Sequence, residues 1–485
     1  MSGFQNVHIR VSDAETNKPT PVRIRFVGSD GKYYAPFGRL TQFTGVGAEV
    51  GGNVMVDGKE YAYIDGACEI RLPVGPVQVE IHKGPEYLPV FETVNLTQGK
   101  LAMRFEIRRW IHMREQGWYS GDTHCFEMSP HAALLEAGGE DLAVVNLLAR
   151  YGPGPSNAPG TIPTSNNISN ILAFSGQKPC LDLSGHRVAV NTFNAHSAGA
   201  LALLNCHRPV FPLTFEFTDK EDSWNLTDWC EQCHRKGGLV VAPNPFKELP
   251  CNEYMADFVL QQIDTIGIVP SSTDSSTLSD WFELLNSGFK VPLSAGSGKA
   301  SNHSRLGEMR TYARIEGECT YKNWIEAVRA GRTFVSAGPM LTLTVDDCGP
   351  GETVNRNGKT VAIVAEVRSL TPVDRLQVAF CGRVVHEVLV EKNQDEYRGT
   401  LRLDYPVESS GWLLARCQGA VTSPVYIHVD NQPMRPNKNS VEFLQREITH
   451  ERDVVRRSKF KDEIQRQRSL SVYDQALEEL KKRLS

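Results

Sequence analysis

Long apolar runs are missing from this chain of 485 residues. No segment reaches the roughly 18 consecutive apolar residues that indicate a membrane-spanning helix, so no membrane partner is expected. The first residues, MSGFQNVHIRVSD, also lack a basic stretch followed by an apolar one, and no signal peptide is visible. A cytoplasmic location is therefore expected, with export left open for a chain whose amino terminus has been trimmed.

An excess of positive charge is missing as well. The formal net charge is −5, which argues against the basic surface that nucleic-acid binding requires. The charged tail after Gln432 has only a small excess of Lys and Arg, so a solvated helical face is expected there rather than a nucleic-acid arm. The predicted partner is a small molecule or a protein, whose identity the sequence does not give, and the oligomeric state is equally open.

Regularly spaced pairs of cysteines are also largely missing from the sequence. The eleven cysteines are scattered and odd in number, which favours reduced and mostly buried thiols. The segment Cys230–His234, CEQCH, matches the pattern of c-type haem attachment. It is better explained as part of a helix between a capping Thr227 and the Gly237-Gly238 stop. Haem attachment would also need export, and no Gly-x-Ser-x-Gly motif supports serine hydrolysis.

The composition is that of a globular protein, with 40% hydrophobic and 22% charged residues, and the length predicts about three domains. Alternating apolar residues predict a β-sandwich over 1–108, which resembles the transthyretin-like carboxypeptidase-regulatory domain. Residues 109–340 mix strands and helices, 341–430 return to alternation and predict a second sandwich, and 431–485 predict a helical tail. The expected fold class is multidomain α/β plus all-β.

The segment most informative about function is Gly117–Asp141, GWYSGDTHCFEMSPHAALLEAGGED. A polar β-like run ends near His124, and a helix is predicted from Pro130 with Ser129 as its N-cap. Functional side chains of α/β proteins lie at the carboxyl ends of strands. Alternate strand residues face the same way, so a His-x-His pair here would aim two imidazoles at one metal ion. The chain offers His124 but has Phe126 at the second position.

Several motifs that follow in order make the chain resemble the PHP-type metallohydrolases, and among them the carbamate-hydrolase-like CehA/McbA group. The motifs are LLNCHRPV (203–210), WCEQCHRKGGLVVAPNPF (229–246), SAGSGKASN (294–302), RTYARI (310–315) and NWIEAVRAGRTFVSAGP (323–339). Their collinear order is more specific than one short match. The resemblance implies a distorted seven-stranded (β/α) barrel over 109–340, flanked by the two sandwiches. It also implies metal ions at the strand ends, zinc or manganese in intact members.

Four ligand positions of that group are altered in this chain. They are Phe126 for the second histidine, Phe193 or Asn194 for a carboxylate, Asn244 for the histidine of Ala-His-Pro, and Ala300 for an aspartate. Phenylalanine and alanine have no lone pair to donate, and a neutral amide suits calcium better than zinc. The resemblance therefore implies a degenerate metal site.

Polar residues around these positions remain. The residual ligand candidates are Asp122, His124 and His196, and the other cleft candidates are Glu127, His131, Lys299 and His303. For Asp122 and His124 the favoured interpretation is a hydrogen-bonded pair that holds the strand end, and for His131 it is a surface position. No catalytic residue is predicted, and the expected cofactor is either none or a weakly bound divalent metal.

Three functions stay open at this point. The favoured hypothesis is a non-catalytic PHP-like protein that binds a ligand or assembles with an intact paralogue, because lost ligands remove the Lewis acid. The second is an active metal-dependent hydrolase of esters, carbamates or phosphoesters with a reduced site. The third is binding of a carbohydrate or surface polymer through the flanking sandwiches. Whether the chain is an enzyme is therefore open, with impaired catalysis expected.

Overall fold

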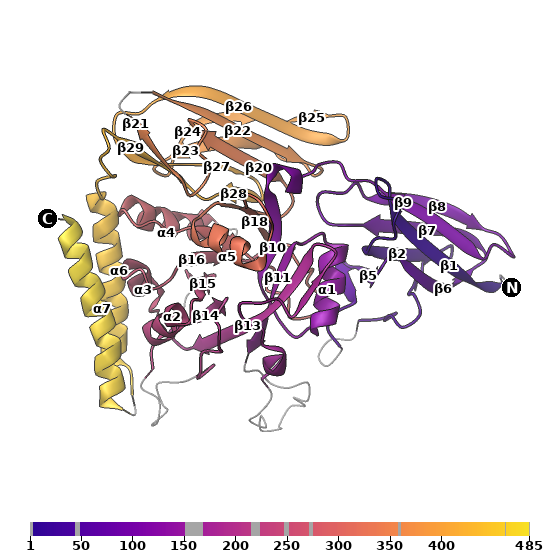
Figure 1. Ribbon diagram of the computed structural model, residues 1–485, viewed down its shortest axis with the longest axis horizontal. Helices are drawn as coiled ribbons and strands as arrows, with labels where there is room; N and C mark the ends of the chain where they lie inside the picture. The colour runs from indigo at the N-terminus through magenta and orange to yellow at the C-terminus, as the bar shows by residue number, and fades with distance from the viewer. Residues whose placement is uncertain are drawn as a thin grey trace.

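The computed structural model describes residues 3–43, 49–150, 168–214, 224–246, 252–270, 275–356, 360–460 and 462–484. Over these residues the chain is a multi-sheet α/β protein with seven α-helices. Figure 1 shows the first strands at one end, a curled sheet with helices in the middle, further strands above it, and two long helices at the other end. None of the described helices has the length and apolar character that crossing a bilayer requires.

The amino-terminal β unit, residues 3–107, consists of two sheets that enclose one apolar core. One sheet has the order β6-β1-β9, and the other has the order β4-β5-β2-β7-β8 with β3 on β2. Alternate residues of β1, Val7, Ile9 and Val11, are buried between them. The strands are β1 (Phe4–Asp13), β2 (Val22–Gly28), β3 (Tyr33–Tyr34), β4 (Asn53–Val56), β5 (Lys59–Ile64), β6 (Ala67–Pro73), β7 (Gly75–His82), β8 (Val90–Leu96) and β9 (Ala102–Ile107).

The central sheet positions the candidate site. Its order is β17-β16-β15-β14-β13-β11-β10, and all of these strands except β14 run parallel. The strands are β10 (Trp118–Cys125), β11 (Val144–Arg150), β13 (His186–His196), β14 (Gly199–Leu204), β15 (Leu239–Pro243), β16 (Thr265–Ile268) and β17 (Leu293–Ala295), with β12 (Leu181–Leu183) paired to β13. The carboxyl ends of the parallel strands therefore meet at one edge.

The central sheet curls until its last strand returns to its middle. β17 reaches β18 (Arg310–Arg314) and β19 (Thr333–Ser336) through hydroxyl groups. The Thr311 hydroxyl donates to the Ala295 carbonyl at 2.9 Å, and the Thr333 hydroxyl donates to the Leu293 carbonyl at 2.7 Å. In the described residues the backbone ladder itself ends at β17. The sheet is thus a curled half-barrel, and the PHP-type seven-stranded barrel stays a prediction.

Helices cover both the outside and the amino end of this sheet. They are α1 (Pro130–Gly139), α2 (Leu226–Arg235), α3 (Tyr254–Val259), α4 (Ser275–Asn286) and α5 (Tyr321–Arg329), with 3-10 turns at η1 (Arg114–Gln116) and η2 (Ile171–Ala173). Tyr321, Trp324 and Val328 of α5 pack in one cluster with Val144 and Leu239 at the starts of β11 and β15. The same cluster includes Phe126, with Phe193 and Ala300 packed against it, so one apolar interior extends from α5 at the amino ends of the strands to the carboxyl end of β10.

Helix caps show where local chemistry decided the fold and where it did not. The predicted N-cap of α1 is confirmed, because the Ser129 hydroxyl accepts from the Ala132 N–H at 3.2 Å. The predicted cap of α2 at Thr227 is wrong. Asn225 accepts from the Asp228 N–H and closes a capping box, while the Thr227 hydroxyl donates to Asp257.

The strands after 340 contribute to two sheets around a second core. β18 and β19 continue through β28, β27, β23 and β24, with β29 and β21 attached, and a separate sheet has the order β20-β22-β26-β25. The strands are β20 (Met340–Val345), β21 (Thr353–Arg356), β22 (Thr360–Ser369), β23 (Arg375–Phe380), β24 (Arg383–Leu389), β25 (Glu391–Asn393), β26 (Glu396–Pro406), β27 (Gly411–Cys417), β28 (Ala420–Thr422) and β29 (Val425–Val429). The pairing of β19 with β28 joins strands on either side of the predicted domain boundary at residue 340. The predicted domain boundaries stay predictions.

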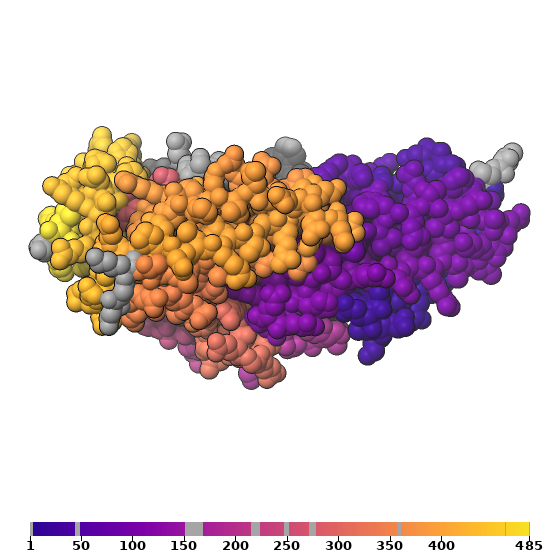
Figure 2. All heavy atoms as spheres, turned by 90° about the horizontal axis from the view of Figure 1, so that it is seen from above, coloured from indigo at the N-terminus to yellow at the C-terminus, as the bar shows by residue number. Residues whose placement is uncertain are grey.

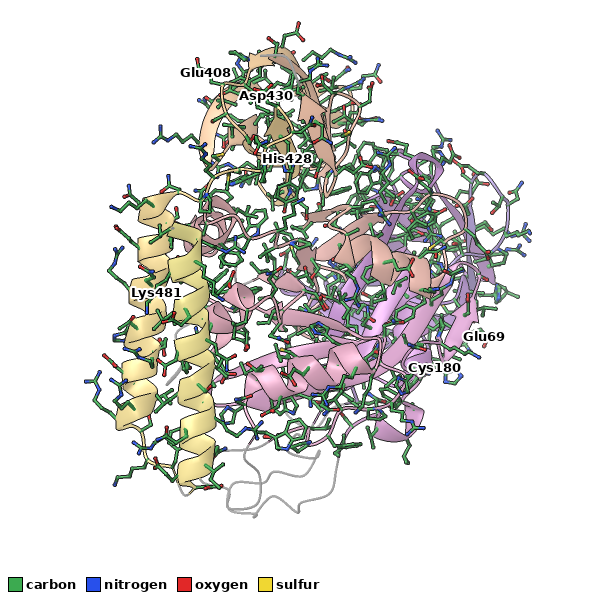
Figure 3. The ribbon with its side chains drawn as sticks, turned by 60° about the vertical axis from the view of Figure 1, so that its left-hand side comes forward. Glu69, Cys180, Glu408, His428, Asp430 and Lys481 are labelled. Atoms are coloured by element: carbon green, nitrogen blue, oxygen red, sulfur yellow. The ribbon has the colours of Figure 1, made fainter. Side chains whose placement is uncertain are left out.

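The tail forms two antiparallel helices, α6 (Lys438–Arg457) and α7 (Glu463–Leu484), along one side of the molecule (Figure 1). In Figure 3 this pair is marked by Lys481, while Glu69 and Cys180 mark the opposite side. Tyr473 and Leu480 are buried in the same core as Trp281, so the tail is packed against the body. Each cysteine that the structure describes is a free thiol.

Candidate functional site

Asp122 lies fully buried at the end of β10, where the sequence placed a residual ligand. Its carboxylate accepts backbone N–H groups from His124 at 3.0 Å, from Ser297 at 3.1 Å and from Gly307 at 3.0 Å. Burial raises the pKa of Asp122 to about 6, although the hydrogen bonds from Ser297, Gly307 and His124 act to lower it. Both oxygens are therefore directed at the backbone, and they fasten β10 to the loop that follows β17.

His124 is 2% exposed and touches the same loop. Its Nδ1 lies 2.9 Å from the Thr123 hydroxyl, and a Cβ on Gly296 would lie 2.6 Å from that same Nδ1, so only glycine fits there. Its Nε2 is buried without a hydrogen-bond partner. Burial lowers the pKa of His124 to about 4, which keeps the imidazole neutral near pH 7.

Hydrocarbon side chains gather beside His124, and we call His124, Phe126, Phe193 and Ala300 the strand-end cluster. The Phe126 ring lies 6.4 Å from the His124 ring and 5.1 Å from the Phe193 ring, measured between centroids. Ala300 packs into the same apolar cluster as both phenylalanines. The Arg150 guanidinium carbon lies 4.4 Å from the Phe126 ring centre and closes the cluster from the outside.

The structure separates the two residues between which the sequence left a choice. Phe193 faces the interior with Phe126. Asn194 faces the other side of β13, where its side-chain N–H groups donate to the carbonyls of Val210 at 2.9 Å and Pro212 at 2.8 Å. Neighbouring strand residues point to opposite faces, so the residue at the candidate site is Phe193. Asn194 holds the 210–212 segment instead.

Asn244 directly follows β15, at the same edge of the sheet as the end of β10. Its backbone is left-handed with φ 48°, a conformation that Asn tolerates better than most residues. Its N–H donates to the Gly267 carbonyl at 2.8 Å. Asn244 is thus at a strand end as expected, with β14, β13 and β11 between its strand and β10.

The remaining candidates spread over several surroundings. His196, at the end of β13, accepts from the Ala198 N–H at 3.1 Å, and burial lowers its pKa to about 3. Glu127 is paired with Arg150 at 2.8 Å. His131 and His303 are exposed. These residues therefore lie in several separate environments and not in one cleft.

Lys299 is completely buried beside the candidate site, and its ammonium group contacts other parts of the protein. Its ammonium donates to the Ser304 carbonyl at 2.8 Å and lies 3.4 Å from Glu136 of α1. Its own carbonyl accepts from the Phe126 N–H at 2.7 Å. Lys299 therefore ties the loop after β17 to α1 and to the end of β10.

A metal ion needs several converging donors. Among the residues that the structure describes, no three His, Cys, Asp or Glu side chains are grouped as such a site requires. The strand-end cluster can exclude water and bind an apolar group, but it presents only one nitrogen. Sequence reasoning missed the roles of Arg150 and Thr123. The Arg150 side chain of β11 reaches the Phe126 ring only in the folded sheet, whereas Thr123 is the sequence neighbour of His124 and its contact depends on the side-chain conformations of both residues.

Comparisons with known proteins give distant likenesses. No protein-family description matches the chain, and no curated protein does. Among solved structures, the chain is similar to the lesion-specific endonuclease PfuEndoQ from Pyrococcus furiosus, with 13% identity and a TM-score of 0.29, over 44% of this chain and 56% of that one. It is also similar to an engineered protein, with 9% identity and a TM-score of 0.13, over 34% and 49% of the two chains.

The matched part spans little more than half of the endonuclease. Likenesses this distant establish neither a family nor an activity.

Proposed function

We propose that this chain is a non-catalytic relative of the PHP-type metallohydrolases, close to the CehA/McbA group, and that it works by binding a ligand or a protein partner. The observation that supports this is the packing of Phe126 against Phe193 and Ala300 beside His124. Hydrocarbon groups at these positions offer no ligand and exclude the water that a hydrolytic metal would activate. In this proposal the chain is a cytoplasmic protein with no metal, or with one that is weakly held.

A second candidate function is favoured by one atom. The Nε2 of His124 is buried without a partner, which is the state of a histidine ligand when no ion is bound. An active hydrolase with a reduced site would need further donors to approach this nitrogen. Asp122 is committed to three backbone N–H groups, so it would have to release some of them first.

Restoring the altered positions tests the proposal. We expect the triple variant Phe126→His, Asn244→His and Ala300→Asp to be less stable than the parent without metal, by about 1–3 kcal/mol, because packing is lost and polar groups are buried. Zinc or manganese should recover the loss, since an ion at a hundredfold excess over its Kd contributes about 2.7 kcal/mol. The measurement is thermal unfolding with and without metal.

The matched control is the double variant Phe126→Leu and Ala300→Asn, which alters the same cluster without adding a histidine or a carboxylate. The control should gain no more from metal than the parent does. If the triple variant also gains no more, these positions do not converge on a former metal site, and the proposal loses its basis.

A further inference from the structure

Two thiol groups face each other beside the surface segment that follows β14. The Sγ atoms of Cys206 and Cys233 lie 3.4 Å apart, and the two side chains are 1% and 0% exposed. Among the cysteines that the structure describes, these are the two whose sulfur atoms come within hydrogen-bonding distance of each other. A disulfide bond is about 2.05 Å long, so the sulfurs would have to approach by about 1.4 Å to form one.

The tertiary fold brings these two thiols together from different elements. Cys206 lies two residues after β14, and Cys233 lies in the last turn of α2, 27 positions further along the chain. A Cβ on Gly238 would lie 2.4 Å from the Cys206 sulfur and 2.5 Å from the Cys233 sulfur. The missing side chain at Gly238 therefore leaves room for both thiols at the turn between α2 and β15.

The segment that carries Cys206 lies at the surface. The next two residues, His207 and Arg208, are exposed. The His207 N–H donates to the Lys236 carbonyl at 3.1 Å, and the Lys236 ammonium donates to the Pro209 carbonyl at 2.8 Å. Figure 1 shows β14 and α2 side by side, away from the carboxy-terminal strands that lie on the face turned to the reader in Figure 2. Surface segments of this kind open locally at a lower free energy than the sheets behind them.

We propose that Cys206 and Cys233 are a redox modification site, at which a low-molecular-weight disulfide such as oxidised glutathione converts the two thiols into one intramolecular disulfide bond. When the segment opens, the Cys206 thiol loses its proton to solvent and its sulfur attacks one sulfur of the oxidant. The sulfur–sulfur bond of the oxidant breaks, and one glutathione leaves. The Cys233 thiol then loses its proton and its sulfur attacks Cys206, which releases the second glutathione.

Electrons and protons balance in this exchange. The protein loses two electrons and two protons, and the oxidant is reduced to two glutathione thiols, each of which takes up one proton. The product bond fastens the end of β14 to α2. Disulfides of this kind in reducing surroundings are transient and respond to oxidants. The inference concerns neither the strand-end cluster nor its metal chemistry, and it holds whether or not the chain is catalytic.

The closed segment makes the reaction slow. Burial, together with the hydrogen bond from Cys206, raises the pKa of the Cys233 thiol, so this thiol stays protonated near neutral pH. The thiolate is the form that attacks a disulfide. Both the entry of the oxidant and the loss of the protons therefore require the segment to open.

Oxidation of the purified full chain tests the proposal. Oxidised glutathione is added in native buffer, the remaining thiols are alkylated in urea, and the protein is digested without reductant for mass spectrometry. We expect a peptide pair linked through Cys206 and Cys233, two fewer alkylated thiols in each chain, and recovery of both thiols with dithiothreitol. Full alkylation of both cysteines, a glutathione that stays on Cys206, or linkage of other cysteines in their place overturns the proposal.

The oxidised chain should also melt at a higher temperature than the reduced chain, by roughly 2–5 °C, because the bond restricts the unfolded chain over a long loop. Differential scanning calorimetry of the two forms measures the shift. A linked chain that melts no higher than the reduced one overturns the statement that the bond fastens β14 to α2.

Matched substitutions distinguish this pair from general oxidation. Cys206→Ala should abolish the linked peptide and leave Cys233 available to alkylation. The control is Cys230→Ala, the same change at a completely buried cysteine one turn before Cys233 in α2, and it should leave the linkage unchanged. Equal loss of linkage in both variants would show that the bond does not depend on this pair and refutes the assignment. The linked peptide is read in the parent chain, so the test stands even where a variant fails to fold.

Discussion

Replacing Asp122 by alanine is expected to lower the free energy of unfolding by about 4 kcal/mol or more. The carboxylate accepts the N–H groups of His124, Ser297 and Gly307 in a fully buried setting. Each buried donor left without a partner costs about 1–3 kcal/mol. Urea unfolding followed by circular dichroism measures the loss.

Asp122→Asn is the control, because it keeps the shape and one acceptor oxygen. We expect its loss of stability to be intermediate between the parent and Asp122→Ala. A chelator should leave the stability of the parent unchanged, since Asp122 acts on the backbone and not on an ion. If Asp122→Ala unfolds within about 1 kcal/mol of the parent, below the cost of one orphaned donor, the structural role assigned to Asp122 is wrong.

Glu140→Ala is expected to have a comparable effect, about 3–5 kcal/mol, by opening the junction between the amino-terminal β unit and α1. Glu140 is fully buried and accepts from Arg23 at 2.9 Å, Arg305 at 3.0 Å and the Tyr63 hydroxyl at 2.8 Å. Removing it leaves guanidinium groups buried without their counter-charge. The control Glu231→Gln breaks an exposed pair with Arg235 and should cost less than about 1 kcal/mol.

The Glu140 contribution should also depend on pH. Burial acts to raise the pKa of Glu140, but Arg23, Arg305 and Arg310 lower it from 4.5 to about 2. The folded state therefore holds the charged form more strongly than the unfolded state does. The stabilisation is complete above pH 4.5 and is lost as the pH falls from 4.5 towards 2. The difference in unfolding free energy between the parent and Glu140→Gln should shrink over that interval, and a constant difference would contradict the assignment.

Local chemistry made parts of the fold predictable. The Ser129-Pro130 pair correctly predicts the start of α1. The apolar run from Leu142 to Leu148 predicts a strand, which the structure has at Val144–Arg150. The Gly237-Gly238 stop likewise separates α2 from β15. In each case the residues that decide the structure are neighbours in sequence, so their pattern is enough.

Other features depend on register and on distant contacts. A shift of one residue turns a strand side chain to the opposite face, so the sequence could not choose between Phe193 and Asn194. Thr227 has the chemistry of a helix cap, but its hydroxyl donates a hydrogen bond to Asp257, which the tertiary fold brings close. Arg23 and Glu140 form an ion pair although they are 117 residues apart in sequence, so no local pattern predicts it.

The candidate site also combines features that the sequence predicts with features that only the tertiary fold creates. That Phe126 and Ala300 cannot bind a metal ion follows from the residue types alone, because neither side chain has a lone pair. Their packing in one apolar cluster, and the hydrogen bonds of Asp122 with backbone groups, form only because the curled sheet brings the end of β10 against the loop after β17. The exposed His131 and His303 could not be distinguished from cleft residues by sequence alone.

The metal content of the purified full chain tests the central claim most directly. The protein would be dialysed against a weak chelator and its zinc and manganese measured by elemental analysis. One histidine beside phenylalanine and alanine cannot match the affinity of a multi-ligand site, so we expect well under one equivalent of either metal. A full equivalent of tightly held zinc or manganese would contradict the account and would restore the hydrolase as the leading function.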